Sequence, residues 1–244
     1  MDDLVEGRNA VLEALRGGVS LREVRIARGL QADETVDEIR HRAREARIPV
    51  RDVDRRSLES MSARGAHQGV VAVAEPFGYV DVPFLIAAGS KLPRSLVVVL
   101  DHVTDPGNLG AVARSCEAAG AVGLVIPSQR SATVGPVARK AAAGALEHLP
   151  VARVPNIVRA LEALKAAGYW VAGASEHAAD SAFDARLDDR LVLVLGSEGE
   201  GLSRLVRENC DFLVSIPMAG RVGSLNVAQA ATLLAFEWAR RAAS

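Results

Sequence analysis

The sequence predicts an α/β protein in which a mostly parallel sheet, with helices on both faces, follows a smaller α/β domain. The chain has 244 residues, of which 49% are hydrophobic and 24% charged, enough for one small and one medium-sized core. From residue 95 onward, continuous Val, Leu and Ile runs alternate with segments of helical periodicity. Such runs are typical of strands that are buried on both faces.

Residues 1–76 predict a compact first domain. Apolar residues at helical spacing predict a helix over 5–15 that ends at Gly17 and Gly18. Extended segments are expected at 24–26, 48–50 and 70–73, and helices at 34–46 and 55–61. Residues 77–94 contain two prolines and two glycines, which predicts a linker with a helical middle over 82–88.

Residues 95–244 predict the larger domain. Strands are expected at 96–100, 122–126, 169–174, 191–195 and 212–216. Helices are expected between and after them, at 109–119, 134–145, 157–167, 202–208 and 225–241. In such sheets, ligands bind beyond the C-terminal ends of the strands.

Three polar loops that contain glycine follow strands of this domain, at 105–110, 196–201 and 216–227. Loops of this kind present backbone N–H and C=O groups, which commonly hold nucleotide-like ligands. We therefore expect the three loops to form one site. Each loop also has a simpler interpretation, because Asn108, Glu198, Ser224 and Asn226 are all of types that favour a helix N-terminus.

Arg114 lies six residues after Asn108 on a predicted helix. A lone arginine on a helix is more often a solvated surface charge than a catalytic group. Its apolar neighbours nevertheless predict that it leans along a buried face toward the loops.

Arginines are dense between residues 40 and 56, although the formal net charge of the chain is −1. This balance excludes a globally basic nucleic-acid-binding protein and leaves room for a local patch. The arginines form either a solvated helix face, since Glu38 and Glu45 are interleaved, or a patch that contacts phosphates.

Several site classes lack support in the sequence. Cys116 and Cys210 are isolated, and His102, His148 and His177 lack metal-ligand spacing, so neither a metal site nor a disulfide framework is expected. No GxGxxG, GxxxxGK[ST], GxSxG or HExxH motif occurs in the expected context. The acidic N-terminus and the lack of an apolar run of about 20 residues predict a cytoplasmic protein.

Together, residues 101–114, 195–201 and 216–227 resemble the three signature motifs of the SpoU (TrmH) branch of the SPOUT RNA 2′-O-ribose methyltransferases. Residues 5–11 and 67–70 are similar to the N-terminal RNA-binding module of the members that methylate a guanosine of 23S ribosomal RNA. Residues 140–150 also resemble those members.

The resemblance implies a deep trefoil knot, S-adenosylmethionine as methyl donor, no metal, and a homodimer whose active sites draw on both subunits. It places the catalytic polar positions at Asn108, Arg114, Glu198, Ser224 and Asn226, and the cofactor contacts at Gly196, Ile216, Met218 and Leu225. Candidate RNA contacts in the first domain are Arg8, Arg40, Arg44, Arg47 and His67. Gly107 and Gly223 depart from the bulkier residues of many relatives, which puts the RNA context in question.

Two questions stay open at this point. Arg114 acts either as a base or as a stabiliser of developing negative charge, and the second role suits a guanidinium better. The substrate is 23S rRNA, transfer RNA or an adenosine of rRNA linked to antibiotic resistance, unless the chain is a catalytically idle RNA-binding assembly factor.

Overall fold

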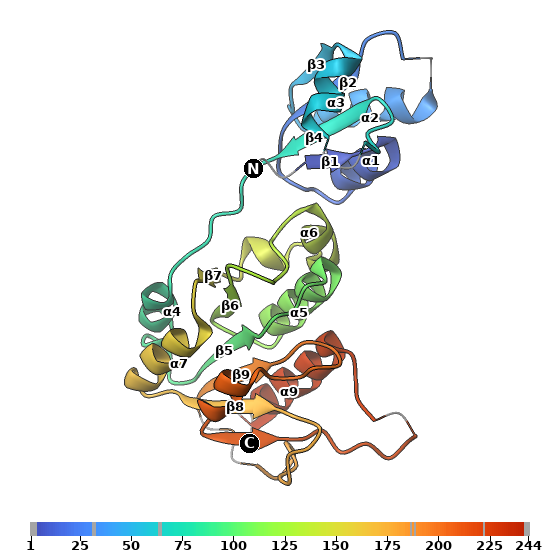
Figure 1. The fold of residues 1–244 in the computed structure, drawn as a ribbon. Coiled ribbons are helices and arrows are strands. Elements are labelled where there is room, and N and C mark those ends of the chain that lie inside the picture. Colours follow the sequence, from blue (N-terminus) through green and yellow to red (C-terminus); the bar gives the residue numbers. More distant parts are fainter. Residues whose placement is uncertain are drawn as a thin grey trace. The chain divides into compact units, whose positions relative to one another are not determined.

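The computed structural model describes residues 4–30, 33–62, 65–185, 187, 189–221 and 223–241. The acidic start, residues 1–3, and Val222 of the third loop lie outside these ranges. The chain divides into two compact units (Figure 1). The first contains the chain up to Gly78 and the stretch 135–140, and the second contains the rest.

The first unit is built on a four-stranded mixed sheet in the order β1-β4-β2-β3. Its elements are β1 (Leu4–Glu6), α1 (Arg8–Arg16), β2 (Leu21–Ala27), α2 (Glu34–Glu45), β3 (Val50–Val53), α3 (Arg55–Met61) and β4 (Val70–Ala74). The predicted helix over 5–15 is wrong at its start, because residues 4–6 pair antiparallel with 71–73 of β4. The strand predicted over 48–50 begins only at Val50 and continues to Val53.

The second unit is built on a six-stranded sheet in the order β10-β8-β9-β5-β6-β7, in which every neighbouring pair is parallel. Its strands are β5 (Ser95–Leu100), β6 (Gly123–Pro127), β7 (Val151–Val154), β8 (Trp170–Ala174), β9 (Arg190–Leu195) and β10 (Phe212–Val214). The helices are α4 (Val82–Gly89), α5 (Pro106–Ala118), α7 (Ile157–Ala166), α8 (Arg204–Glu208) and α9 (Val227–Arg241), with a 3₁₀ turn at Ala145–Glu147. A further helix, α6 (Pro136–Ala142), begins in the stretch 135–140 that belongs to the first unit. The predicted parallel α/β architecture is confirmed.

Helices cover both faces of this sheet, as Figure 1 shows. Successive side chains of a strand point to opposite faces. Val97 and Val99 of β5 accordingly pack in a core with residues of α4, α7 and α8, while α5 and α9 cover the opposite face. Because all six residues of β5 are buried, the strand sequence is continuously apolar rather than alternating.

The helix predicted in the middle of the segment 77–94 is confirmed as α4, and its residues Val82 and Leu85 are buried in the second core. The domain boundaries at 76 and 95 stay a prediction. Two other local predictions differ from the structure. The helix predicted over 134–145 is interrupted after α6, where Ala143 and Gly144 have φ of +48° and +94°. The strand β7 was not predicted, because its four residues give too short a pattern.

None of the helices in the described parts of the chain has both the length and the apolar character needed to cross a bilayer.

The C-terminal helix α9 is anchored by a buried carboxylate. Glu237, whose side chain is 9% exposed, lies 2.9 Å from guanidinium nitrogens of Arg240 and Arg241. Arg241 in turn donates to the carbonyl oxygens of Ala182 (2.9 Å) and Phe183 (2.8 Å). Hydrogen bonds from Arg240 and Arg241 lower the pKa of Glu237 to about 2.

Replacing Glu237 with Gln is expected to lower the free energy of unfolding by about 1–3 kcal/mol at pH 7. A carboxyl group with a lowered pKa in the folded state stabilises the protein above its ordinary pKa, near 4.5, and loses this effect as the pH falls toward 2. Urea unfolding at pH 7, 5 and 3 should therefore show a difference between wild type and variant that shrinks below pH 5. A constant difference, or one equal to that of the exposed control Glu162→Gln, would contradict the assignment.

Candidate active site

The order of the strands places a switch point beside β5. From β5 the chain moves to β6 and then β7 on one side, whereas β9, β8 and β10 lie on the other side. The loops after β5 and β9 therefore diverge at the C-terminal edge of the sheet. In parallel α/β sheets, this is where ligands bind.

Three polar side chains that follow three different strands meet at this edge: Asn108 in the first turn of α5, and Glu198 and Asn226 in loops. Asn108 donates from Nδ2 to Glu198 Oε1 at 3.0 Å, and Asn226 donates from Nδ2 to the same oxygen at 2.5 Å. Asn226 Nδ2 also lies 3.1 Å from Asn108 Oδ1. Since 90 residues separate Asn108 from Glu198 along the chain, only the tertiary fold brings the three together.

The simpler capping interpretations hold for one of these residues. Asp105, rather than Asn108, caps α5, because its Oδ1 accepts from the backbone N–H of Asn108 at 2.7 Å. Asn226 does cap α9, with Oδ1 accepting from Ala228 N at 2.8 Å, while its amide nitrogen reaches Glu198. Glu198 lies well before α8, which begins at Arg204.

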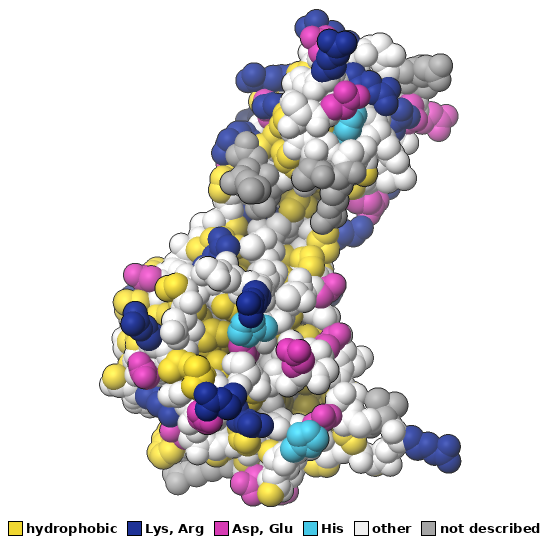
Figure 2. Space-filling model, viewed as in Figure 1, with side chains coloured by type: hydrophobic (Ala, Val, Ile, Leu, Met, Phe, Trp, Pro, Cys, Tyr) yellow, Lys and Arg dark blue, Asp and Glu magenta, His cyan; other side chains and the backbone are white. Residues whose placement is uncertain are grey.

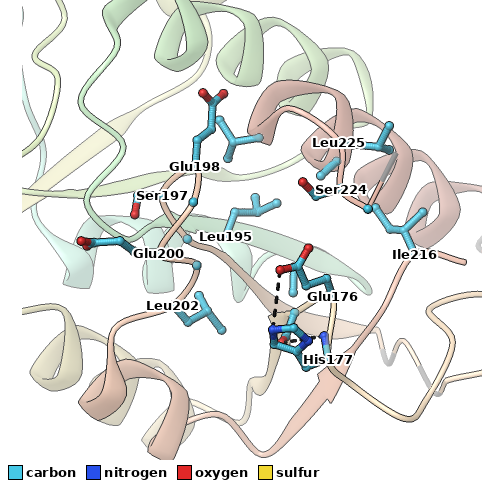
Figure 3. A pocket seen from close by; sticks show the side chains of 18 of the residues that line it. Glu176, His177, Leu195, Ser197, Glu198, Glu200, Leu202, Ile216, Ser224 and Leu225 are labelled. Atoms are coloured by element: carbon cyan, nitrogen blue, oxygen red, sulfur yellow. Dashed lines mark hydrogen bonds and ion pairs between the residues drawn. The ribbon is translucent and has the colours of Figure 1, made fainter. Parts of the chain in front are cut away.

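A cavity of about 270 Å³ opens beside these residues, at the ends of β8, β9 and β10 (Figure 3). Its walls are formed by residues 174–177 and 195–202, by Arg207 of α8, and by residues 214, 216, 218, 223–225, 227 and 230. The predicted cofactor residues all line it, namely Gly196, Ile216, Met218 and Leu225, as do Glu198 and Ser224. Asn108, Arg114 and Asn226 are not among its lining residues.

One wall of the cavity is made largely of backbone. Ser197 and Gly201 exchange two backbone hydrogen bonds of 3.1 and 2.9 Å, which fold the loop tightly back on itself. A Cβ atom at Gly196 would lie 2.1 Å from the carbonyl carbon of Gly201. The loop therefore offers peptide groups, beside the apolar side chains of Leu195, Ile216 and Leu225, which suits a flat nucleoside with polar edges.

Arg114 is exposed on α5, which corrects the expectation that it leans along a buried face. Among the described residues its guanidinium has no hydrogen-bond or ion-pair partner. Its helix packs against α9, where Ser115 Oγ lies 2.6 Å from Thr232 Oγ1. The residues of α5 that are buried are instead Leu109, Gly110, Val112, Ala113 and Cys116.

Sequence reasoning missed the segment after β8. Glu176 and His177 of this segment line the cavity, as does Arg207 of α8. His177 Nε2 lies 3.6 Å from Glu176 Oε1, and both side chains are more than half exposed. The same rule that selected the other loops, polar residues directly after a parallel strand, would have selected this one.

A buried carboxylate, that of Asp101, supports the loop after β5. Asp101 is fully buried, and its two oxygens contact His102 Nδ1 at 2.5 Å and the backbone N–H of Ser203 at 2.7 Å. His102 adopts a φ of +59°, a conformation that is uncommon outside glycine. The carboxylate thereby ties the loops after β5 and β9 to each other.

The predicted RNA contacts of the first unit fall into three groups. Arg8 pairs with Asp33 and Arg40 with Asp52. His67 is only 4% exposed, and its Nδ1 accepts from the backbone N–H of Gly69 at 3.0 Å, so its ring shapes a turn and offers little surface to RNA.

Arg44 and Arg47 form the third group: both are exposed, and within the described ranges neither guanidinium has an ion-pair partner. Figure 2 shows Lys and Arg side chains interspersed with acidic ones over the first unit. The structure therefore leaves these two cations available for an anionic ligand.

Neither cysteine is suited to nucleophilic chemistry. Burial raises the pKa of both Cys116 and Cys210 to about 12, which keeps the thiols protonated. Within the described part of the chain, no group of three His, Cys, Asp or Glu side chains could hold a metal ion.

Comparison with protein families gives matches to both parts of the chain. Residues 95–236 match the family described as the SpoU rRNA methylase family. Residues 4–80 match the family described as RNA 2′-O ribose methyltransferase substrate binding.

Similar proteins extend over nearly the whole chain. A protein of Mycobacterium ulcerans described as an uncharacterized tRNA/rRNA methyltransferase is 43% identical over 98% of this chain and 77% of its own length. The SpoU methyltransferase AviRb from Streptomyces viridochromogenes, solved with AdoMet, is 31% identical with a TM-score of 0.69, covering 99% of this chain and 90% of its own. An AdoMet-bound rRNA methyltransferase from Sinorhizobium meliloti is 26% identical with a TM-score of 0.65, covering 98% and 87%.

Replacing Gly196 with Ala is expected to lower the free energy of unfolding by about 1–3 kcal/mol or more, because the added methyl group meets backbone that cannot rotate away. Gly220 is the matched control, since a Cβ there would meet no atom within 4 Å. Thermal and urea unfolding of both variants would measure the difference. Equal stability of the two variants would show that the loop yields to the methyl group.

Proposed function

The chain belongs to the SpoU rRNA methylase family and is an S-adenosylmethionine-dependent RNA methyltransferase, and we propose that it methylates the ribose 2′-hydroxyl of a guanosine in 23S ribosomal RNA. The observation that carries this proposal is the meeting of Asn108, Glu198 and Asn226 beside the cavity. The match of the first unit to a substrate-binding family supports RNA as the partner.

The residues of the cavity fit the methyl donor. Gly196, Ile216, Met218 and Leu225 would hold its nucleoside part through backbone groups and apolar side chains. The bound donor supplies an electrophilic methyl group on a positively charged sulfur. Ser224, also in the wall, would fix the polar end of the ligand or the reacting ribose.

Asn108, Glu198 and Asn226, which are hydrogen-bonded at the cavity edge, would position the reactants and take no part in the bond changes. Glu198 Oε1 accepts from both amide side chains, which holds three segments in one arrangement. Such positioning can supply much of the rate, because the ribose oxygen must be aligned with the bond that it attacks.

Arg114 would act on the ribose oxygen from a neighbouring subunit. Its side chain is exposed and lies outside the lining of its own cavity, so a homodimer that faces α5 toward the partner's cavity would complete the site. A guanidinium is a permanent cation in proteins. We therefore assign it the stabilisation of developing negative charge and the orientation of a phosphate, and the proton leaves to solvent.

The first unit would grip RNA through phosphates. Arg44 and Arg47 are exposed cations without partners in the described ranges, whereas Arg8 and Arg40 are held by aspartates. We propose Arg44 and Arg47 as the main contacts and a structural role for His67. The knot and the homodimer implied by the resemblance, and the cytoplasmic location predicted from the sequence, belong to the same proposal.

A methylation assay tests the function. The full-length protein, tritiated S-adenosylmethionine and unmodified 23S rRNA should give label that maps to the ribose of a guanosine. Transfer RNA and a 23S rRNA already methylated at that ribose are the parallel substrates. Label in tRNA or at an adenosine would select one of the other enzyme activities, and no label in any RNA would favour an idle assembly factor.

Within this assay, Arg114→Ala is expected to lower kcat by about 100- to 1,000-fold, because one donor to the developing charge is lost. Its affinity for the methyl donor, measured by calorimetry, should stay within about twofold of wild type, since Arg114 does not line the cavity of its own subunit. Lost cofactor affinity with normal turnover at saturation would contradict the role. Sedimentation as a monomer at assay concentrations would contradict the shared site.

Replacing both Arg44 and Arg47 with Ala is expected to weaken binding of the RNA and to make the binding less dependent on salt. Each phosphate contact that is lost should reduce the slope of log K against log salt by about 0.7 to 0.9. Fluorescence anisotropy with a labelled rRNA fragment at several salt concentrations would measure this slope. The control is Arg159→Ala on α7, an exposed arginine of the second unit, and an equal effect of both variants would refute the patch.

A further inference from the structure

We propose that Glu176 makes the cavity prefer the positively charged methyl donor over the spent product, S-adenosylhomocysteine. This inference rests on the proposed assignment of the cavity to the cofactor. It concerns a residue outside the three motif loops, on the segment after β8.

Glu176 lies in the wall of the cavity, just after β8, which pairs with a strand on each side. It follows β8 by two residues, and its side chain is 53% exposed. In Figure 3 its carboxylate points toward the space between Leu195, Ser224 and Ile216. Among the described residues, its side-chain partner is His177, whose Nε2 lies 3.6 Å from Glu176 Oε1 and which is charged only when protonated.

The carboxylates and guanidinium that line the cavity, counted together with Glu176, give it an excess of negative charge. Three carboxylates line it, from Glu176, Glu198 and Glu200, against the single guanidinium of Arg207. Glu198 is engaged by Asn108 and Asn226, and Glu200 points away from the space that Glu176 faces (Figure 3). Glu176 is therefore the carboxylate best placed to act on a ligand inside.

The reaction changes the charge of the ligand by one unit. The donor carries a sulfonium, an ammonium and a carboxylate, for a net charge of +1. On methyl transfer, the ribose oxygen forms a bond to the methyl carbon, the electron pair of the carbon–sulfur bond stays on sulfur, and the hydroxyl proton leaves to solvent. The product is then neutral overall, so a nearby carboxylate attracts the donor more strongly than the product.

The size of the effect follows from Coulomb's law. A carboxylate that lay about 6 Å from the positive charge of the donor, in a half-solvated cavity, would change affinity by about three- to tenfold. A cavity without such a carboxylate would hold donor and product alike, and product would then compete with donor at each turnover.

The test is calorimetric binding by the full-length protein of three ligands: S-adenosylmethionine, S-adenosylhomocysteine and sinefungin, which carries an ammonium in place of the sulfonium. Glu176→Gln is expected to raise Kd for S-adenosylmethionine and sinefungin by about three- to tenfold and Kd for S-adenosylhomocysteine by less than twofold. The matched control is Glu162→Gln on α7, an exposed carboxylate outside the cavity, which should change none of the three. Circular dichroism of each variant verifies the fold.

The outcomes separate this inference from the function on which it rests. Equal weakening of all three ligands would overturn the charge preference, because Glu176 would then contact a part that they share, such as the ammonium or the ribose. Unchanged affinities would overturn it as well. If wild type bound none of the three, the cofactor assignment of the cavity would fail and the inference with it.

Discussion

One carboxylate oxygen holds the site together, because it accepts hydrogen bonds from two amide side chains. Glu198 Oε1 receives Nδ2 of Asn108 and of Asn226, and these residues follow three different strands. Asp101 also links the segments after β5 and β9, through the backbone N–H of Ser203, but Glu198 contacts residues that follow both β5 and β10. The parallel order of the sheet makes the contact possible, because it places the C-terminal ends of these strands at one edge.

Around that contact, backbone groups form much of the cavity wall, and polar side chains lie at its edge or outside it. The loop at 196–201 folds back through two hydrogen bonds between Ser197 and Gly201, and it leaves peptide groups as the cavity wall. Side chains with specific chemistry stand at the edge of the cavity, where Asn108 and Asn226 lie, or outside it, where Arg114 lies.

The charges are distributed to suit two ligands of opposite sign. The chain as a whole has a formal net charge of −1. The cavity, with three carboxylates and one guanidinium in its walls, has an excess of negative charge that suits a cationic methyl donor. Arg44 and Arg47 of the first unit, in contrast, are exposed cations that suit the phosphates of RNA.

The sequence by itself determined the parts that depend on local pattern. The continuous apolar runs at β5 and β9, the helices α2 and α3, and the three glycine loops were all predictable, because periodicity and turn residues act over a few neighbouring positions. Strand β1 was not, since its pairing with β4, some 65 residues away, overrides its helical spacing.

Only the tertiary structure decided which side chains meet. Asp105 rather than Asn108 caps α5, which frees Asn108 to reach Glu198. Glu176 enters the cavity, and Arg114 stays on the surface. These outcomes depend on the order and register of strands that are distant along the chain, and no short segment contains that information.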